Sequence, residues 1–293
     1  MIAYNPKEWF SFIVYFPKTD TFRKLIPMML GVAAYSFIVS YVEVEVLKLS
    51  ENSHAKNITM MHSLLGFVIS LLLVFRTNTA YDRWWEGRKL WGSLTNNSRN
   101  LALKLDSILK REEDRTFFRA TIPSYAAALR DHLRREQTRI ELFDPDDKKG
   151  KKKITLDETK HIPNQIAGVL YGKINALHTE GVISGYQLMY LNTELQSFTD
   201  ICGACERIRN TPIPYSYSMF IKKFIFFYVI TLPIGYVFNL GYYVIPVVVF
   251  IFYVLASLEL IAEEIEEPFG RDGDDLPLNR MSQSIQKHIE EIL

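Results

Sequence analysis

Three long runs without a charged side chain constrain this chain more than any other feature. They extend over Leu25–Val42, Ile58–Phe75 and Phe224–Leu258, and they hold 18, 18 and 35 residues. At 1.5 Å per residue, an 18-residue helix reaches about 27 Å, close to the thickness of the hydrocarbon core of a bilayer. Because a chain of 293 residues has little interior in which to bury such helices, the runs predict membrane spans.

The third run is too long for one span. Asn239 and Gly241 lie near its middle, and both residue types favour turns. We therefore expect two helices joined by a tight turn near 239–243. The whole chain is predicted to be an all-α membrane protein with four spans, at about 24–47, 57–80, 219–239 and 243–262.

Lysine and arginine counts predict the orientation. Four cationic residues lie before or at the start of the first span, namely Lys7, Lys18, Arg23 and Lys24, and four lie near or after the end of the second, namely Arg76, Arg83, Arg88 and Lys89. The loop between these spans holds only Lys48 and Lys56. The positive-inside rule then places both termini and residues 81–218 in the cytoplasm. We expect the spans to lie in the cell (inner or plasma) membrane. The net charge of +1 offers no electrostatic case for nucleic acid as a partner.

The chain is expected to divide into five segments. Residues 1–23, rich in aromatic side chains, are typical of a segment that lies on membrane lipid. The cytosolic region is predicted to be helical over 94–135, 161–180 and 184–209, without strands, and its lysine run at 148–153 to be a solvated loop. The segments are an interfacial 1–23, spans 1 and 2 in 24–80, a cytosolic 81–218, spans 3 and 4 in 219–262, and an acidic cytosolic tail 263–293.

The sequence holds few motifs that are typical of catalytic, redox or metal sites. Cys202 and Cys205 form a lone CxxC, which is a redox pair, half of a zinc site, or a pair of buried small residues, and we favour the last. None of the six histidines is paired at metal-ligand spacing, although His62 lies inside a predicted span. No catalytic motif is present, so we expect neither an enzyme nor a bound cofactor.

The second span leads directly into the sequence RTNTAYDRWWEGRKLWG, which begins at Arg76. Arg76 is expected either to reach the lipid headgroups or to face a wet interior. Within the span, Phe67, Leu71 and Phe75 repeat at i, i+4 and i+8 and share one helix face. Such a stripe is either ordinary packing or, if several copies surround an axis, a set of stacked apolar rings.

The motif RTNTAYDRWWEGRKLWG resembles the signature of the bacterial branch of the bestrophin family of ion channels. CERIRNTPIPYSYS, AEEIEEPFG and DDLPLN are similar to further family segments, in the same order and with the same four-span layout. The resemblance covers nearly the whole chain. It implies a homopentamer around one central pore that passes small monovalent ions, with chloride or another anion expected from the family and a cation such as sodium an alternative in the bacterial branch.

The resemblance also assigns residues. It implies that the second helix of each subunit lines a hydrophobic neck, which falls here on Phe67, Leu71 and Phe75. A second constriction at the cytosolic exit would fall near Tyr186. Polar residues beyond the neck are expected to influence which ions pass; the candidates are Asn78, Asp82 and Glu86.

Eukaryotic members bind calcium in an acidic clasp after a Pro-Phe-Gly motif, and this chain has Pro268-Phe269-Gly270. Asp272 and Asp275 match acidic positions of the clasp, but Arg271 departs from them. Calcium takes 6–8 oxygen ligands, so the site would need nearby carboxylates too. The possible calcium ligands here are Glu264, Glu267, Asp272 and Asp275, and the alternative is a solvated acidic tail.

Two other classes of function stay open. A secondary transporter usually shows an internal repeat and broken helices, and the sequence shows no repeat, although Pro233 and Pro246 could break helices. A signalling or scaffold protein would use its cytosolic helices to bind a partner and would conduct no ions.

Overall fold

The chain folds into two compact units. The computed structural model describes residues 20–48, 58–136, 142–143, 153–154 and 156–293. Most of the expected interfacial segment, and residues 148–152 of the lysine run, lie outside the described residues. The apolar unit comprises the described chain up to Asp82 together with Pro212–Glu266, and the polar unit comprises Arg83–Thr211 and Glu267–Leu293.

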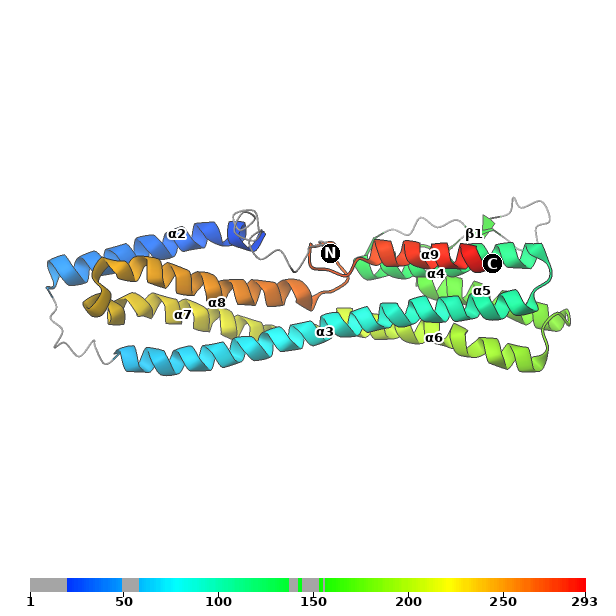
Figure 1. Cartoon of the computed structure of the whole chain (residues 1–293), viewed down its shortest axis with the longest axis horizontal. Helices are drawn as coiled ribbons and strands as arrows, with labels where there is room; N and C mark the ends of the chain where they lie inside the picture. The colour runs from blue at the N-terminus through cyan, green and yellow to red at the C-terminus, as the bar shows by residue number, and fades with distance from the viewer. Residues whose placement is uncertain (1–19, 49–57, 137–141, 144–152, 155) are drawn as a thin grey trace. The chain divides into compact units, whose positions relative to one another are not determined.

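The apolar unit contains the three uncharged runs, all of them helical. Helices α2 and α7 both pack against α8, as Figure 1 shows, and the first part of α3 joins their core through Ile69 and Leu73. The elements are α2 (Asp20–Tyr41), a π-helical turn η2 (Val42–Val46), α3 (Ile58–Ile108), α7 (Tyr215–Leu240), a 3₁₀ turn η4 (Gly241–Tyr243) and α8 (Val244–Glu266).

The predicted turn within the third run is confirmed. The run breaks at η4, where Gly241 adopts φ 54° in the region that favours glycine. Three helical stretches of the described chain are long and apolar enough to cross a membrane, namely Thr21–Val46, Thr59–Ile108 and Tyr215–Glu266. The last of these contains both α7 and α8, so its chain reverses at η4.

Helix α3 is longer than expected. The predicted span at 57–80 and the first part of the predicted helix 94–135 are one helix, because no proline interrupts residues 58–108. The prediction of one helix over 94–135 was wrong at its middle. The chain leaves the helix after Ile108, Arg111 is extended with ψ 128°, and a new helix starts with three acidic residues that suit a helix N-terminus.

The polar unit is a bundle of helices around a separate apolar core. Helix α4 packs on both α5 and α9, α5 packs on α6, and the second part of α3 adds Leu101 and Leu105 to the core. Ser184 and Gln187 form a capping box that starts α6. The elements are α4 (Glu112–Arg134), α5 (Ile162–Thr179), α6 (Gly185–Asn210) and α9 (Leu278–Ile292).

One short strand pair departs from the all-helical expectation. Strand β1 (Leu142–Phe143) pairs antiparallel with β2 (Lys153–Ile154), with Leu142 opposite Ile154. Two residues are too few to produce a readable alternation of apolar and polar side chains, which explains why the sequence did not indicate them. The described residues otherwise keep the predicted all-α class.

The C-terminal stretch is part of the fold. Residues 263–293 were expected to form an acidic tail, but α8 extends to Glu266 and α9 packs against α4. Leu278, Ile285 and Ile289 of α9 are buried in the core of the polar unit. Their spacing of seven and four residues places them on one face of a helix, which explains the packing.

Candidate functional site

The stripe of Phe67, Leu71 and Phe75 lies on the outer surface of the apolar unit. These side chains are 67%, 45% and 55% exposed. Ile69 and Leu73, on the other side of α3, are 1% exposed and pack with residues of α7 and α8. The helix therefore turns one apolar face to its own chain and presents the other, which carries the stripe, to its surroundings.

Exposure of apolar side chains is not limited to this stripe. Phe227 on α7 and Phe250 on α8 are each 64% exposed, as lipid-facing side chains would be. The structure of a single chain thus separates the inward face of α3 from its outward face.

The polar candidates follow the stripe along α3. Asn78 and Asp82 are exposed and lie one turn apart on the same side of the helix. Glu86 is half-buried, and its Oε1 lies 2.6 Å from Nη2 of Arg207 on α6. Asn78 and Asp82 are therefore open to solvent in the single chain, whereas the Glu86 charge already has a cationic partner.

Arg76 neither reaches outward nor faces a wet interior, so both expectations for it were wrong. Its side chain is 1% exposed; Nη2 lies 2.7 Å from Glu266 Oε2, and Nε lies 3.5 Å from Glu259 Oε1. Glu266 Oε1 also accepts the backbone N–H of Ile213 at 2.6 Å. Arg76, which follows the second uncharged run, is thus paired with carboxylates that follow the third run. These ion pairs tie α3 to α8, and the Glu266 hydrogen bond to Ile213 ties α8 to the segment before α7.

The signature after Arg76 contacts the other segments that carry the family resemblance. Arg83 donates to the backbone oxygens of Ile208 and Thr211 at 2.6 and 2.5 Å, so it caps the C-terminal end of α6. Trp84 Nε1 donates to the Asp274 oxygen at 3.0 Å. Gly87 lies under Phe269, where an added Cβ would come within 3.1 Å of the ring. The stretch is therefore a structural junction within the polar unit.

Asp272 and Asp275 lie in one tight loop. Asp275 is 2% exposed, and its Oδ2 accepts the backbone N–H of Asp272 at 2.6 Å. Its Oδ1 is buried without a hydrogen-bond partner among the described residues, and burial raises the pKa of Asp275 to about 6. Arg271 pairs with Glu136 at 2.8 Å, so its positive charge has a carboxylate partner other than Asp272 and Asp275.

The other two calcium candidates are placed differently. Glu264 belongs to the apolar unit, where its carboxylate lies 2.8 Å from Lys24 Nζ of α2. Glu267 is an exposed residue of the polar unit. The structure thus joins Asp272 to Asp275 and gives Glu264 a cationic partner of its own.

Tyr186 lies in the first turn of α6 and is 89% exposed. Met189 and Tyr190, three and four residues further on, are also exposed. The structure therefore gives α6 an apolar outer face near its N-terminal end, and Tyr186 belongs to it.

The prediction that the two cysteines are buried small residues is confirmed. Cys202 and Cys205 are free thiols at 2% and 0% exposure. Burial raises the pKa of Cys202 to about 12 and shifts that of Cys205 upward as well. Neither thiol has the thiolate character that redox exchange requires. His62 is also buried, with its Nε2 2.9 Å from Thr231 Oγ1.

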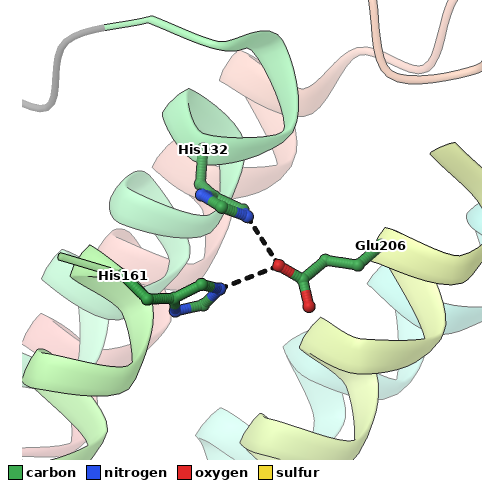
Figure 2. A group of neighbouring side chains, drawn as sticks. All are labelled: His132, His161 and Glu206. Atoms are coloured by element: carbon green, nitrogen blue, oxygen red, sulfur yellow. Dashed lines mark hydrogen bonds and ion pairs between the residues drawn. The ribbon is translucent and has the colours of Figure 1, made fainter. Parts of the chain in front are cut away.

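The fold assembles one cluster that the sequence did not indicate. His132, His161 and Glu206 come from α4, the start of α5 and α6, and Figure 2 shows both rings directed at one carboxylate oxygen. Nε2 of His132 lies 2.7 Å, and Nε2 of His161 2.8 Å, from Glu206 Oε1. The expectation that no histidines pair at ligand spacing holds along the chain but not in space. No motif marks these positions, so only the fold reveals them.

The protonation states in this cluster follow from its environment. Burial lowers the pKa of His132, although the bond to Glu206 opposes the shift. Burial alone would raise the pKa of Glu206, but the hydrogen bonds from His161 and His132 outweigh it and the pKa is lowered. The carboxylate is thus ionised and His132 neutral at neutral pH.

Comparison with known proteins identifies similar chains along the whole length. A model of the family described as Bacterial/Fungal Bestrophin protein matches residues 1–291. A voltage-dependent anion channel-forming protein of Nostoc sp. is 36% identical over 232 residues, which cover 78% of this chain and 75% of that protein. One of Ralstonia nicotianae is 30% identical over 300 residues, covering 100% and 94%.

Solved structures agree with the sequence comparison. A substituted form of a bacterial bestrophin homologue from Klebsiella pneumoniae superimposes with a TM-score of 0.76 at 28% identity. The match covers 92% of this chain and 98% of the Klebsiella chain.

Proposed function

The chain belongs to the bacterial and fungal bestrophin family, and from this premise we propose that it forms a homopentameric channel for small monovalent ions. It is a membrane protein whose relatives are named as anion channel-forming proteins. The observation that carries the proposal is the apolar stripe of α3, which its own chain leaves uncovered while the opposite face is buried.

In the proposed assembly, α3 of each subunit faces the axis with Phe67, Leu71 and Phe75. Five copies of each residue would form an apolar ring. Such a ring offers no charge and no hydrogen bonds to replace the hydration shell of an ion. It therefore passes ions only when it is wide enough to stay wet, which makes the neck a gate rather than a selective binding site.

The proposed membrane topology has four spans, formed by α2, the first part of α3, α7 and α8. The reversal at η4 supports two crossings in the third apolar stretch. The cationic residues that flank the first two spans support cytoplasmic termini and a cytoplasmic polar unit in the inner membrane. In this topology Tyr186 lies on the cytosolic side, where its exposed ring is available to form a second constriction.

We propose that charged and polar groups outside the neck contribute most to the ion preference. The names of the relatives favour an anion such as chloride. The exposed Asp82 follows the stripe on α3, however, and a ring of five carboxylates would favour a cation such as sodium. Aromatic edges at Phe67 and Phe75 carry partial positive charge and act in the opposite direction. The sign of the selectivity is therefore the first property to measure.

Calcium dependence is a second property of the proposal. Asp272 and Asp275 share one loop, and the buried Oδ1 of Asp275 has no partner among the described residues, which supports a ligand at this place. The two carboxylates alone do not supply the 6–8 oxygens that calcium takes, so backbone oxygens and water would have to complete the shell.

Purified full-length protein in a planar bilayer, with a NaCl gradient and with calcium either present or chelated, tests these statements. A reversal potential on the chloride side makes the protein an anion channel, and one on the sodium side makes it a cation channel. Absence of current at every voltage and calcium level, from protein shown to be pentameric, would overturn the channel proposal in favour of a transporter or scaffold.

A further inference from the structure

The cluster of His132, His161 and Glu206 lies wholly within the polar unit and has no part in the proposed ion pathway. Each residue offers one ligand atom, and the three atoms lie within 4.8 Å of one another. All three side chains are half-buried, so solvent and small ions can reach them.

Backbone contacts bring the three residues together. His132 lies in the last turn of α4, and its backbone oxygen accepts a hydrogen bond from Nη1 of Arg209 at 2.8 Å, which holds α4 against the end of α6. His161 is the N-cap residue of α5. The positions of the ligand atoms are thus set by helix ends rather than by a long loop, which is the arrangement that keeps a site in place before a ligand arrives.

We propose that His132, His161 and Glu206 bind one divalent transition-metal ion of the zinc class. Two imidazole nitrogens and one carboxylate oxygen are a ligand set that zinc uses in tetrahedral sites, with a water molecule in the fourth position. The same donors are poor ligands for magnesium or calcium, which prefer oxygen. Both Nε2 atoms already point at one spot, now held by Glu206 Oε1 (Figure 2).

The geometry requires only a small rearrangement. Zinc lies about 2.0–2.1 Å from its ligand atoms. The ion would take up the point on which the two nitrogens converge, and the Glu206 carboxylate would withdraw along its flexible side chain to bind from the other side. The charge of Glu206 compensates part of the charge of the ion. Of the two neighbouring arginines of α6, Arg209 is anchored on the backbone oxygen of His132, and Arg207 is paired with Glu86.

One hydrogen bond of the metal-free cluster has to break when a metal binds. His161 Nδ1 accepts the backbone N–H of Asn164 at 3.1 Å, so the ring proton is on Nε2 in the metal-free cluster. Binding through Nε2 shifts this proton to Nδ1 and breaks the cap bond. Loss of an N-cap hydrogen bond changes the folding equilibrium constant by about five-fold. Loss of a metal ligand costs more, because removal of even an outer-shell partner weakens metal binding about 10- to 100-fold. The ligand bond therefore outweighs the cap.

A bound ion would clamp the end of α4, the start of α5 and α6 to one another. Because the ion binds the folded cluster and not the unfolded chain, it would raise the melting temperature of the polar unit.

The test uses purified full-length protein, treated with a chelator and then titrated with Zn²⁺ in competition with a chromophoric chelator. His161→Asn is the decisive variant, because asparagine is a good N-cap and can keep the bond to the Asn164 amide, but it lacks the imidazole. Glu206→Gln is the second variant, because its amide oxygen can still accept a hydrogen bond. His288→Gln, which removes a histidine hydrogen-bonded to Arg99 outside the cluster, is the matched control.

We expect the unsubstituted protein to bind one Zn²⁺ per chain with a dissociation constant below about 1 µM. His161→Asn and Glu206→Gln should each weaken binding by about 100-fold or more, whereas His288→Gln should not change it. Zn²⁺ should raise the melting temperature of the unsubstituted protein and of the control only. Metal loading should also speed hydrogen exchange at the Asn164 amide.

Two results would overturn the proposal. One is equal Zn²⁺ affinity in the unsubstituted protein and in His161→Asn or Glu206→Gln, whichever of these variants folds. The other is no binding at micromolar Zn²⁺. Ion conduction plays no part in either measurement, so failure here leaves the channel proposal unaffected.

Discussion

Nη2 of Arg76 lies 2.7 Å from the Glu266 carboxylate, and the arginine side chain is 1% exposed. Glu259 provides a second carboxylate at 3.5 Å, at 4% exposure. The guanidinium Nη1 and one Glu259 oxygen are buried without a partner among the described residues. A buried ion pair of this kind is a weak source of stability as a whole, but each partner depends strongly on the others.

Removal of the Arg76 charge should therefore destabilise the apolar unit. Arg76→Gln removes the paired cation from the buried Glu259 and the half-buried Glu266, and we expect a loss of about 3–5 kcal/mol in the free energy of unfolding. Lys222→Gln is the control, because Lys222 and Glu263 form an exposed pair worth below about 1 kcal/mol. Thermal unfolding in detergent measures both. Similar small losses in the two variants would contradict the interpretation of Arg76.

Truncation of the neck residues should widen the pore. Leu71→Ala and Phe75→Ala each remove apolar bulk from a proposed ring, so we expect a severalfold rise in single-channel conductance. Leu30→Ala on α2 and Phe227→Ala on α7 remove the same side chains from other exposed positions. These controls should conduct as the unsubstituted channel does. A rise in the controls as well, or no rise at Leu71 and Phe75, would remove the neck assignment.

Asp275 should make stability fall as pH rises from about 4 to 6. Its pKa is raised from 3.8 to about 6 in the folded protein, so in this window the folded state binds more protons than the unfolded state. The cost of the charge at pH 7 is about 1–3 kcal/mol. Asp275→Asn keeps an acceptor for the Asp272 N–H, so it should be more stable than the unsubstituted protein at pH 7.

Melting temperatures between pH 4 and 7 check this prediction. Asp274→Asn is the control, because the Asp274 side chain is exposed in the same loop. Parallel pH profiles for Asp275→Asn and the unsubstituted protein would show that Asp275 does not titrate in this window. Calcium bound at the loop should stabilise the unsubstituted protein at pH 7 but not Asp275→Asn.

Helix α9 should contribute to the stability of the polar unit. Ile285→Ala removes a side chain that is 1% exposed in the core, and we expect a cost of about 2–5 kcal/mol. Lys287→Ala, two residues away on the exposed face, should change stability by less than about 0.5 kcal/mol. Thermal unfolding distinguishes the two. Equal effects would mean that the C-terminal stretch behaves as the solvated tail that its composition suggested.

Local patterns were enough to predict the helical class and the main apolar helices. Each uncharged run forms helix wherever the structure describes it, and the turn near residue 241 lies where glycine permits φ 54°. These features depend on residues that are close in sequence. The length of an uncharged run predicts a long apolar helix, and the conformational freedom of a single glycine permits the turn. For the same reason, the stripe of Phe67, Leu71 and Phe75 could be placed on one helix face before the fold was known.

Long-range packing decided the rest. The partners of Arg76 lie about 180–190 residues further along the chain, and no local signal connects them. His132, His161 and Glu206 converge only because α4, α5 and α6 pack side by side and bring their ends together. A sequence determines which face of each helix is apolar, but the packing of whole helices determines which polar side chains meet, because such contacts carry no periodic signature along the chain.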